Sequence, residues 1–240
     1  MKIEKLEWDS NFFSLNIYKL NELIQQDENF QNKLEKFVFE NNVDLIYFES
    51  DYLIENLFID FKSLKAYLVD TKTTFSKTAA YNAFDQKLIK KTSEIEVDKY
   101  EDKIIKLALQ SAQYSRFKVD KNFSEDDYKK LYKEWIINSI NKKIAKEILF
   151  YQIEDDIAGL ITLGVKSNIG DIGIVAVEDK YRGQGIAKKM LFATENWFFE
   201  NNLKTINVVT QGDNLPAKAL YKSCGYKIIK RKFFYHLWKI

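Results

Sequence analysis

The sequence predicts an α/β (α+β) fold, in which a sheet is flanked by helices. The first observation is that strand-like and helix-like patterns alternate over the first 75 residues, as in an α/β layer. The second is that a β-branched apolar run, Ile172–Val177, precedes a glycine-containing loop and an amphipathic helix. The third is composition. Of the 240 residues, 46% are hydrophobic and 15% are aromatic, which is ample for a packed core.

The charge balance and the cysteine content exclude several classes of protein. Lys and Arg number 37 against 35 Asp and Glu, and this net charge of +2 argues against a nucleic-acid binder built on a general basic field. The single cysteine, Cys224, excludes an intrachain disulfide and fits a reducing compartment. No apolar run approaches the length of a membrane span and no secretory pattern begins the chain, so we expect a cytoplasmic protein. We expect no metal site, because no cluster of ligand residues occurs, and we expect His236 to be structural.

The N-terminal third predicts a small α/β domain. The expected strands are residues 2–8, 15–20, 45–49 and 64–74, and the expected helices are residues 27–41 and 52–61. Between the first two strands we expect a polar turn that carries Trp8, Phe12 and Phe13. Residues 76–98 are polar and weakly periodic, so we place the domain boundary there, with one domain at 1–95 and another at 96–240.

Two helices and a hairpin follow. The first helix is expected at about residues 100–110, and Ser124 with Asp127 has the spacing of a capping box that opens the second. An apolar and aromatic stripe on the second helix recurs at helical spacing and is expected in the core: Tyr128, Leu131, Tyr132, Trp135, Ile136 and Ile140. Strands at 147–153 and 157–165 then predict a hairpin that turns at Asp155-Asp156.

The stretch Asp171–Trp197 carries the first sign of chemistry. Its strand is followed by a loop with Gly183 and Gly185 and then by a helix. Such a loop leaves backbone N–H groups without helical acceptors, and the helix dipole adds positive potential, so this helix end suits a phosphate. Arg182 and two lysines add charge at the same point. An ordinary tight turn that enters a helix is the alternative.

The last segment adds a second pattern. Residues 205–210 predict a strand parallel to Ile172–Val177 if the crossover is right-handed. Asn214 is a good N-cap, the only proline lies in the first turn of the helix that follows, and Gly225 suits its left-handed end. This is at least a well-capped helix. Residues 226–240 predict a final strand that closes the sheet.

Together the two patterns resemble the GNAT superfamily of N-acyltransferases. Arg182-Gly183-Gln184-Gly185-Ile186-Ala187 fits its Arg/Gln-x-x-Gly-x-Gly/Ala signature. The segment from Asn214 through Ala217, Tyr221 and Gly225 to Tyr226 fits Asn-x-x-Ala-x-x-x-Tyr-x-x-x-Gly-Tyr/Phe. The resemblance covers roughly residues 124–240. It implies a GNAT fold, with a central mixed, splayed sheet flanked by helices, preceded here by the smaller N-terminal α/β domain.

The resemblance also implies a coenzyme and an acid. The coenzyme would be an acyl-CoA, either acetyl-CoA or a short-chain form such as 3-hydroxybutanoyl-CoA. The residues assigned to it are Ala176, Val177, Arg182, Gly183, Gln184, Gly185, Ile186, Ala187, Asn214, Ala217 and Tyr221. The backbone N–H of Val177 would polarise the thioester carbonyl, and Tyr221 would be the general acid for the thiolate. The alternative is that Tyr221 only packs. No general base is evident, although Glu178 and Asp179 follow the strand, and Cys224 as a nucleophile is improbable because no histidine neighbours it.

Two further motifs bear on the acceptor. Trp8-Asp9-Ser10-x-Phe12-Phe13 and Tyr114-Ser115-Arg116-Phe117 resemble the TDP-fucosamine N-acetyltransferase family and related nucleotide-aminosugar N-acyltransferases. This implies transfer to a dTDP-linked 3- or 4-amino-dideoxyhexose for a surface polysaccharide of the O-antigen type. The residues that would border this acceptor are Trp8, Phe12, Phe13, Tyr114, Arg116 and Phe117. Arg116 would be a partner for the diphosphate, and core packing is the alternative for the aromatic residues.

Two other functions remain open. The same fold could acylate another amine, such as a protein N-terminus or a polyamine, or the chain could be a CoA-binding module without turnover. The expected partners are small molecules, with no nucleic acid and no membrane span, and the protein is expected to be a monomer or a homodimer.

Overall fold

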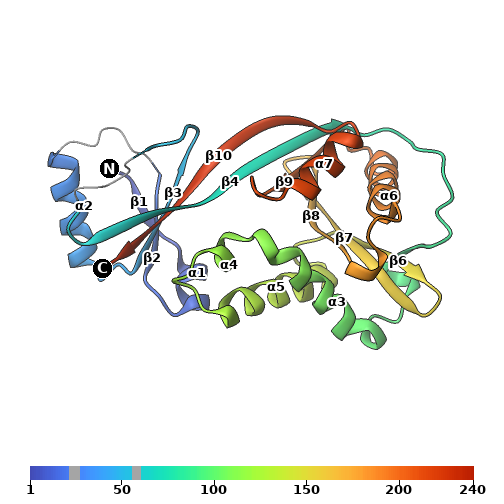
Figure 1. Cartoon of the computed structure of the whole chain (residues 1–240), viewed down its shortest axis with the longest axis horizontal. Helices are drawn as coiled ribbons and strands as arrows, with labels where there is room; N and C mark the ends of the chain where they lie inside the picture. The colour runs from blue at the N-terminus through green and yellow to red at the C-terminus, as the bar shows by residue number, and fades with distance from the viewer. Residues whose placement is uncertain (22–27, 56–60) are drawn as a thin grey trace. The chain divides into compact units, whose positions relative to one another are not determined.

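The computed structural model describes residues 1–21, 28–55 and 61–240. The chain forms two compact units, one of Met1–Lys72 with Arg231–Ile240 and the other of Thr73–Lys230. The strands follow one another in the order β1-β2-β3-β10-β4-β9-β8-β7-β6-β5 (Figure 1). The first unit ends at Lys72 and also includes the C-terminal Arg231–Ile240, whereas we expected the boundary at residue 95. The reason is that Thr73–Thr78 pairs with one strand of the second unit, and Ile89–Lys91 pairs with another.

The first unit is a small α/β layer. It contains β1 (Ile3–Lys5), α1 (Glu7–Phe13), β2 (Ile17–Leu20), α2 (Glu28–Glu40), β3 (Leu45–Ser50), the first part of β4 (Leu64–Thr78) and the last part of β10 (Lys227–Lys239). β2 and β3 are parallel, and β10 is antiparallel to β3. Leu34 and Val38 of α2 are fully buried against Ile46 and Phe48 of β3. The expected α/β pattern of this region is confirmed.

Three expectations for this unit differ from the structure. The first strand ends at Lys5, and the aromatic segment is the helix α1 and not a turn. Ser10 stabilises α1, because its hydroxyl donates to Ile17 O at 3.2 Å and accepts from Ile17 N at 3.0 Å. Residues 52–55 are not helical, and residues 56–60 of the helix expected at 52–61 lie outside the described residues.

The final strand also lies elsewhere than expected. β10 lies between β3 and β4 in the strand order and does not close the sheet at an edge. Its residues Phe234, Tyr235, His236 and Leu237 are all buried. A strand buried on both faces belongs inside a sheet, which explains the position of β10.

The second unit has its own mixed sheet between helices. Its strands are the last part of β4, β5 (Ile89–Lys91), β6 (Glu147–Ile153), β7 (Asp156–Lys166), β8 (Ile169–Val177), β9 (Thr205–Thr210) and the first part of β10. The expected β6–β7 hairpin is confirmed as an antiparallel pair, and β8 and β9 are parallel as expected. Ser167 and Asn168, which join β7 to β8, both have positive φ, as a tight hairpin turn requires.

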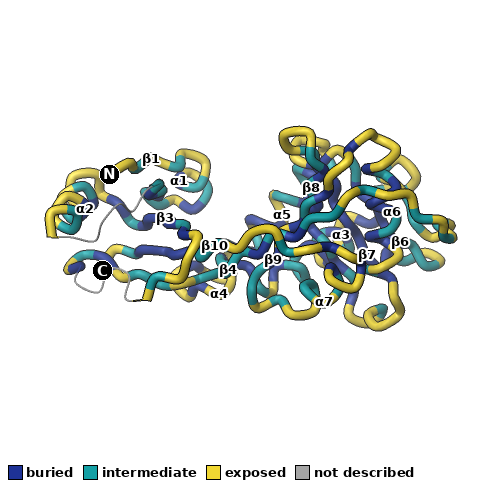
Figure 2. The backbone as a smooth tube through the Cα atoms, turned by 90° about the horizontal axis from the view of Figure 1, so that it is seen from above, coloured by how far each residue is buried: buried dark blue, intermediate teal, exposed yellow. Residues whose placement is uncertain are grey.

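Helices cover both faces of this sheet (Figure 1). α3 (Val97–Ser111) and α5 (Glu125–Ile140) bury one face, whereas α6 (Ile186–Glu200) and α7 (Leu215–Ser223) bury the other. The expected capping box of α5 is confirmed, because Ser124 Oγ accepts from Asp127 N at 3.2 Å and Ser124 N donates to Asp127 Oδ2 at 2.8 Å. Most of its aromatic stripe is buried, with Trp135 and Ile140 half-buried. Figure 2 shows the buried backbone that runs through β7 and β8.

Strands β8 and β9 pair over only part of their length. Gly170–Ile172 of β8 pair with Ile206–Val208 of β9. The remaining residues of β8 do not pair with β9. On its other edge, β8 pairs with β7 as far as Val177. The expected mixed, splayed sheet is therefore confirmed, and the splay leaves one edge of β8 open at its C-terminal end. No helix in the described parts of the chain is both long and apolar enough to cross a membrane.

Candidate active site

The backbone N–H groups of β8 point alternately towards β7 and towards the open edge of the strand. Ile174 N donates to Thr162 Oγ1 of β7 at 2.8 Å, and Glu178 N donates to Ala158 O at 2.8 Å. Because successive N–H groups of a strand point to opposite edges, Val175 and Val177 direct theirs to the side of β9. On that side β9 has already separated from β8. Val177 therefore presents its N–H at the splay, whereas the N–H of Ala176 points towards β7.

The loop after β8 presents a second set of free donors. Gly183 and Gly185 have φ of +78° and +74°, a conformation that glycine adopts without strain. Gly185 is the N-cap of α6 and no side chain caps this end, so the first N–H groups of the helix have no acceptor from a capping residue. A Cβ added at either glycine would meet nothing within 4 Å, so the face of the loop is open. The predicted anion site is therefore accessible.

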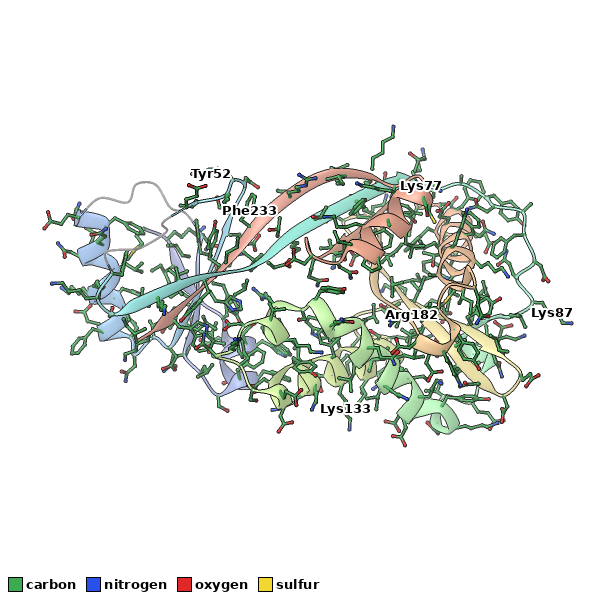
Figure 3. All side chains as sticks on the ribbon, viewed as in Figure 1. Tyr52, Lys77, Lys87, Lys133, Arg182 and Phe233 are labelled. Atoms are coloured by element: carbon green, nitrogen blue, oxygen red, sulfur yellow. The ribbon has the colours of Figure 1, made fainter. Side chains whose placement is uncertain are left out.

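The other residues of the loop hold it in place. Arg182 Nε donates to Val177 O at 3.0 Å, and Arg182 Nη1 lies 2.7 Å from Asp179 Oδ1 (Figure 3). Ile186, the first residue of α6, is buried in the core. Gln184 is exposed, and its Nε2 lies 3.5 Å from the Lys180 carbonyl oxygen. The guanidinium thus ties the loop to the end of β8.

Helix α7 brings Tyr221 to the same face of the sheet as α6. Asn214 Oδ1 accepts from Ala217 N at 3.2 Å, which confirms Asn214 as the N-cap. The ring of Tyr221 is buried, with its centroid 5.5 Å from that of Phe75. Within the described residues its hydroxyl makes no hydrogen bond, and burial raises its pKa well above the ordinary value. Tyr221 is therefore a protonated donor without a protein acceptor.

The two carboxylates after β8 are engaged elsewhere. Glu178 is 8% exposed, and its Oε2 lies 2.6 Å from Lys103 Nζ. Burial by itself raises the pKa of Glu178, but the hydrogen bond and charge of Lys103 outweigh it and the pKa is lowered. Asp179 pairs with Arg182. Glu178 is therefore a poor base at neutral pH, and Asp179 is held in an ion pair. The sequence did not suggest the role of Lys103, because this residue lies 75 positions before Glu178.

The geometry supports neither a nucleophilic role for Cys224 nor a metal site in the described residues. Cys224 is buried, and burial raises the pKa of its thiol, which disfavours the thiolate. Among the described residues there is no group of three His, Cys, Asp or Glu side chains that could hold a metal ion.

The residues predicted to border the acceptor lie in both units. In the first unit, Trp8 is 51% exposed and stacks on Phe12 at 4.9 Å, while Phe13 is buried. In the second unit, the Arg116 guanidinium lies 4.6 Å from the ring centroid of the buried Phe117. Phe13 and Phe117 thus serve the cores of their units. Trp8 and Phe12 form a partly exposed aromatic pair, and Tyr114 is half-buried at the end of a short 3-10 turn, Ala112–Tyr114.

Known proteins share this architecture. Among solved structures, a conserved protein of unknown function from Staphylococcus epidermidis is similar over 93% of this chain and 83% of its own, with a TM-score of 0.61 and 14% identity. A GCN5-related N-acetyltransferase from Sphaerobacter thermophilus is similar over 99% of this chain and 76% of its own, with a TM-score of 0.58 and 12% identity. At such identities the likeness concerns the fold alone. The chain belongs to the acetyltransferase (GNAT) family, whose model matches residues 107–226.

Three curated relatives are similar over shorter stretches. N-alpha-acetyltransferase 30 of Saccharomyces cerevisiae is 38% identical over 68 residues, which are 28% of this chain and 39% of that protein. Spore coat polysaccharide biosynthesis protein SpsD of Bacillus subtilis is 24% identical over 135 residues, 56% of this chain and 46% of its own. Streptothricin acetyltransferase of Escherichia coli is 30% identical over 77 residues, 32% of this chain and 44% of its own. The chain thus spans less than half the length of each.

Proposed function

We propose that the protein is an acyl-CoA-dependent N-acyltransferase. Its acceptor is the amino group of a dTDP-linked 3- or 4-amino-dideoxyhexose that is used for a surface polysaccharide. The observation that carries the proposal is the splay of β8 from β9, which frees the Val177 N–H beside a loop of uncapped amides. The acyl donor is acetyl-CoA or another short-chain acyl-CoA.

The coenzyme is held by two parts of the site. Its pyrophosphate lies on the N–H groups at the start of α6, where the helix dipole and the exposed Lys188 and Lys189 favour an anion. Its pantetheine arm enters the splay and hydrogen-bonds to the open edge of β8. The thioester carbonyl then accepts from Val177 N, and Asn214 and Ala217 flank the arm from the start of α7.

Acyl transfer follows from these positions. The neutral amine attacks the thioester carbon, a C–N bond forms, and the charge on the oxygen is stabilised by the Val177 N–H. Collapse breaks the C–S bond, the sulfur accepts the proton of the Tyr221 hydroxyl, and the amine loses its extra proton to water. Water then returns a proton to Tyr221. The raised pKa of Tyr221 ensures that this hydroxyl is protonated at neutral pH when the thiolate departs.

The choice of acceptor rests on two further points. SpsD, a spore coat polysaccharide biosynthesis protein, is similar to more than half of this chain. The exposed Trp8, stacked on Phe12, offers an apolar surface of the kind that a sugar or a base covers.

A protein N-terminus is a second candidate acceptor. It is favoured by the 38% identity to N-alpha-acetyltransferase 30 over 68 residues. Assays with a dTDP-linked 4-amino-4,6-dideoxyhexose and with an unblocked peptide, each with acetyl-CoA, distinguish the two by the rate of thiol release.

Substitution of Tyr221 by Phe tests the catalytic part of the proposal. The hydroxyl has no protein partner in the described structure, so its removal leaves the fold and the affinity for acetyl-CoA unchanged. If the hydroxyl protonates the thiolate, kcat falls by about 100-fold or more, the usual contribution of a general acid. Steady-state thiol release and calorimetry with acetyl-CoA measure the two quantities.

Tyr226→Phe is the matched control. Tyr226 is another buried tyrosine, with its ring centroid 6.1 Å from that of Tyr221. We expect it to retain kcat, because the family signature accepts either Tyr or Phe there. An unchanged kcat in Tyr221→Phe would refute the acid role. A wild-type protein that binds acetyl-CoA but acylates no amine would instead be a CoA-binding module.

A further inference from the structure

A cavity of about 370 Å³ lies beside the end of β8 and wholly within the second unit. Its wall comes from α3, the turn that follows it, α4 (Arg116–Val119) and the loop after β8. The lining residues are Lys106, Leu109, Gln110, Gln113, Lys118, Asp179 and Arg182. The volume is within the range of small-ligand pockets, and Arg182, one of the lining residues, is labelled in Figure 3.

The lining carries an excess of positive charge. It contains three cations, Lys106, Lys118 and Arg182, against one carboxylate, Asp179, and that carboxylate is paired with Arg182. Lys118 makes no ion pair within the described residues, and its Nζ lies 5.2 Å from the ring centroid of Tyr128. Lys106 has a single long contact, 3.8 Å from Glu178 Oε1. The two lysine charges are thus available to an anion in the cavity.

The wall also contains an acceptor without a donor. Gln110 Oε1 is buried, and no described residue forms a hydrogen bond with it. A buried carbonyl oxygen left without a donor is unfavourable. The oxygen is closed to solvent, so a ligand N–H or O–H group would reach it only if the Gln110 side chain turned towards the cavity.

The cavity is linked to the end of β8 through Arg182. Arg182 lines it and donates through Nε to Val177 O at 3.0 Å. A molecule that contacts Arg182 is therefore separated from Val177 only by the Arg182 side chain. Val177 is the residue whose N–H is proposed to face the thioester.

We propose that this cavity binds the phosphate groups of the acceptor, with Lys106 and Lys118 as the cations that select a nucleotide-linked substrate. The proposal rests on the proposed function and deepens it, because it assigns the acceptor diphosphate to α3 and α4. Neither lysine belongs to the loop that holds the coenzyme. A polyamine acceptor is disfavoured by the same positive lining.

Calorimetry with thymidine diphosphate tests the subsite without turnover. The titration is done in the presence of saturating CoA, so that the coenzyme site is filled, and is repeated with thymidine as an uncharged probe. We expect the affinity for thymidine diphosphate to fall about 10-fold in Lys106→Met and in Lys118→Met, and about 100-fold in the double variant. The affinity for CoA is expected to stay within twofold, and thymidine to bind equally to all variants.

Lys133→Met is the matched control, an exposed lysine on α5 in the same unit (Figure 3). It is expected to bind thymidine diphosphate like the wild type. Absence of thymidine diphosphate binding by the wild type, equal affinity in all variants, or an equal loss of CoA affinity in Lys106→Met would each overturn the proposal.

Turnover separates the subsite from the proposed function. If the lysines control binding of thymidine diphosphate but no dTDP-linked amino sugar is acylated, the proposed acceptor is wrong and the phosphate subsite stands. If the amino sugar is acylated with the same KM by the wild type and the double variant, the function stands and the subsite is refuted.

Discussion

Replacement of Gly185 by alanine is expected to lower both the Tm and the affinity for acetyl-CoA. The size of each loss distinguishes backbone strain from impaired coenzyme binding. Gly185 has a φ of +74° at the start of α6, and a Cβ there would meet nothing within 4 Å. The variant therefore suffers no steric clash in the free protein. Its cost is the left-handed conformation itself, about 1–2 kcal/mol for a residue with a Cβ. For a chain of 240 residues, this corresponds to a fall in Tm of about 2–8 °C.

The effect on the coenzyme should be larger than the effect on stability. The added methyl group stands on the open face of the loop, where a phosphate must approach the amides. A hydrogen bond to a charged group contributes about 1.5–3 kcal/mol. The loss of one such bond weakens binding of acetyl-CoA by about 10-fold to 100-fold, measured by calorimetry on the folded variant at 25 °C.

Gly225→Ala provides the comparison. Gly225 has a φ of +83° after α7, and its Cβ would come no closer than 3.7 Å to Lys77 Cε, an ordinary contact. We expect the same loss of Tm with no loss of acetyl-CoA affinity. If Gly185→Ala binds acetyl-CoA as tightly as Gly225→Ala does, the amides of this loop do not hold the phosphates and our assignment of the coenzyme site is wrong.

Three further substitutions test the packing and charge around the site. Burial raises the pKa of Asp156, but hydrogen bonds from Lys103 and a second lysine lower it to about 2. Because this folded-state pKa lies below the ordinary 3.8, Asp156→Asn should cost about 1 kcal/mol at pH 7 after solvent screening. The difference from the wild type should shrink as the pH falls below 4 towards 2, measured by urea unfolding. Gln110→Leu removes a buried oxygen without a donor, so we expect an unchanged or higher urea midpoint. Gly170→Ala places a Cβ 2.7 Å from the ring of the fully buried Phe198, which should destabilise the second unit by about 1–3 kcal/mol in the same experiment.

Much of the second unit follows from local patterns in the sequence. The β-branched run before the loop, the capping box at Ser124 and the left-handed position of Gly225 each reflect interactions between residues close in the chain. Such patterns identify elements and their ends. They do not identify the order of strands, which depends on pairing between distant segments. The position of β10 between β3 and β4 was therefore missed, although its buried run from Phe234 to Leu237 is compatible with it.

The helix α1 was missed for a related reason. Its seven residues are too few for a clear helical period, and the polar residues between its three aromatics suggested a turn between strands. The helix is stabilised by the hydroxyl of Ser10, which exchanges hydrogen bonds with the backbone of Ile17. A contact of this kind depends on the position of β2 and cannot be inferred from the segment alone.

The candidate site divides in the same way between local and distant contributions. The glycines and Asn214 act through their own backbone or that of near neighbours, so their spacing in the sequence was informative. Lys103 and Lys106, which contact Glu178, and Lys118, which lines the cavity, come from α3 and α4 and approach the loop only in the folded chain. This convergence also bears on the missing base. Lys103 and Arg182 hold Glu178 and Asp179, so these carboxylates fix the loop, and the lowered pKa of Glu178 makes it a poor base at neutral pH. Under the proposed function, the acceptor amine therefore reaches the thioester already neutral, and the protein orients it beside the N–H of Val177.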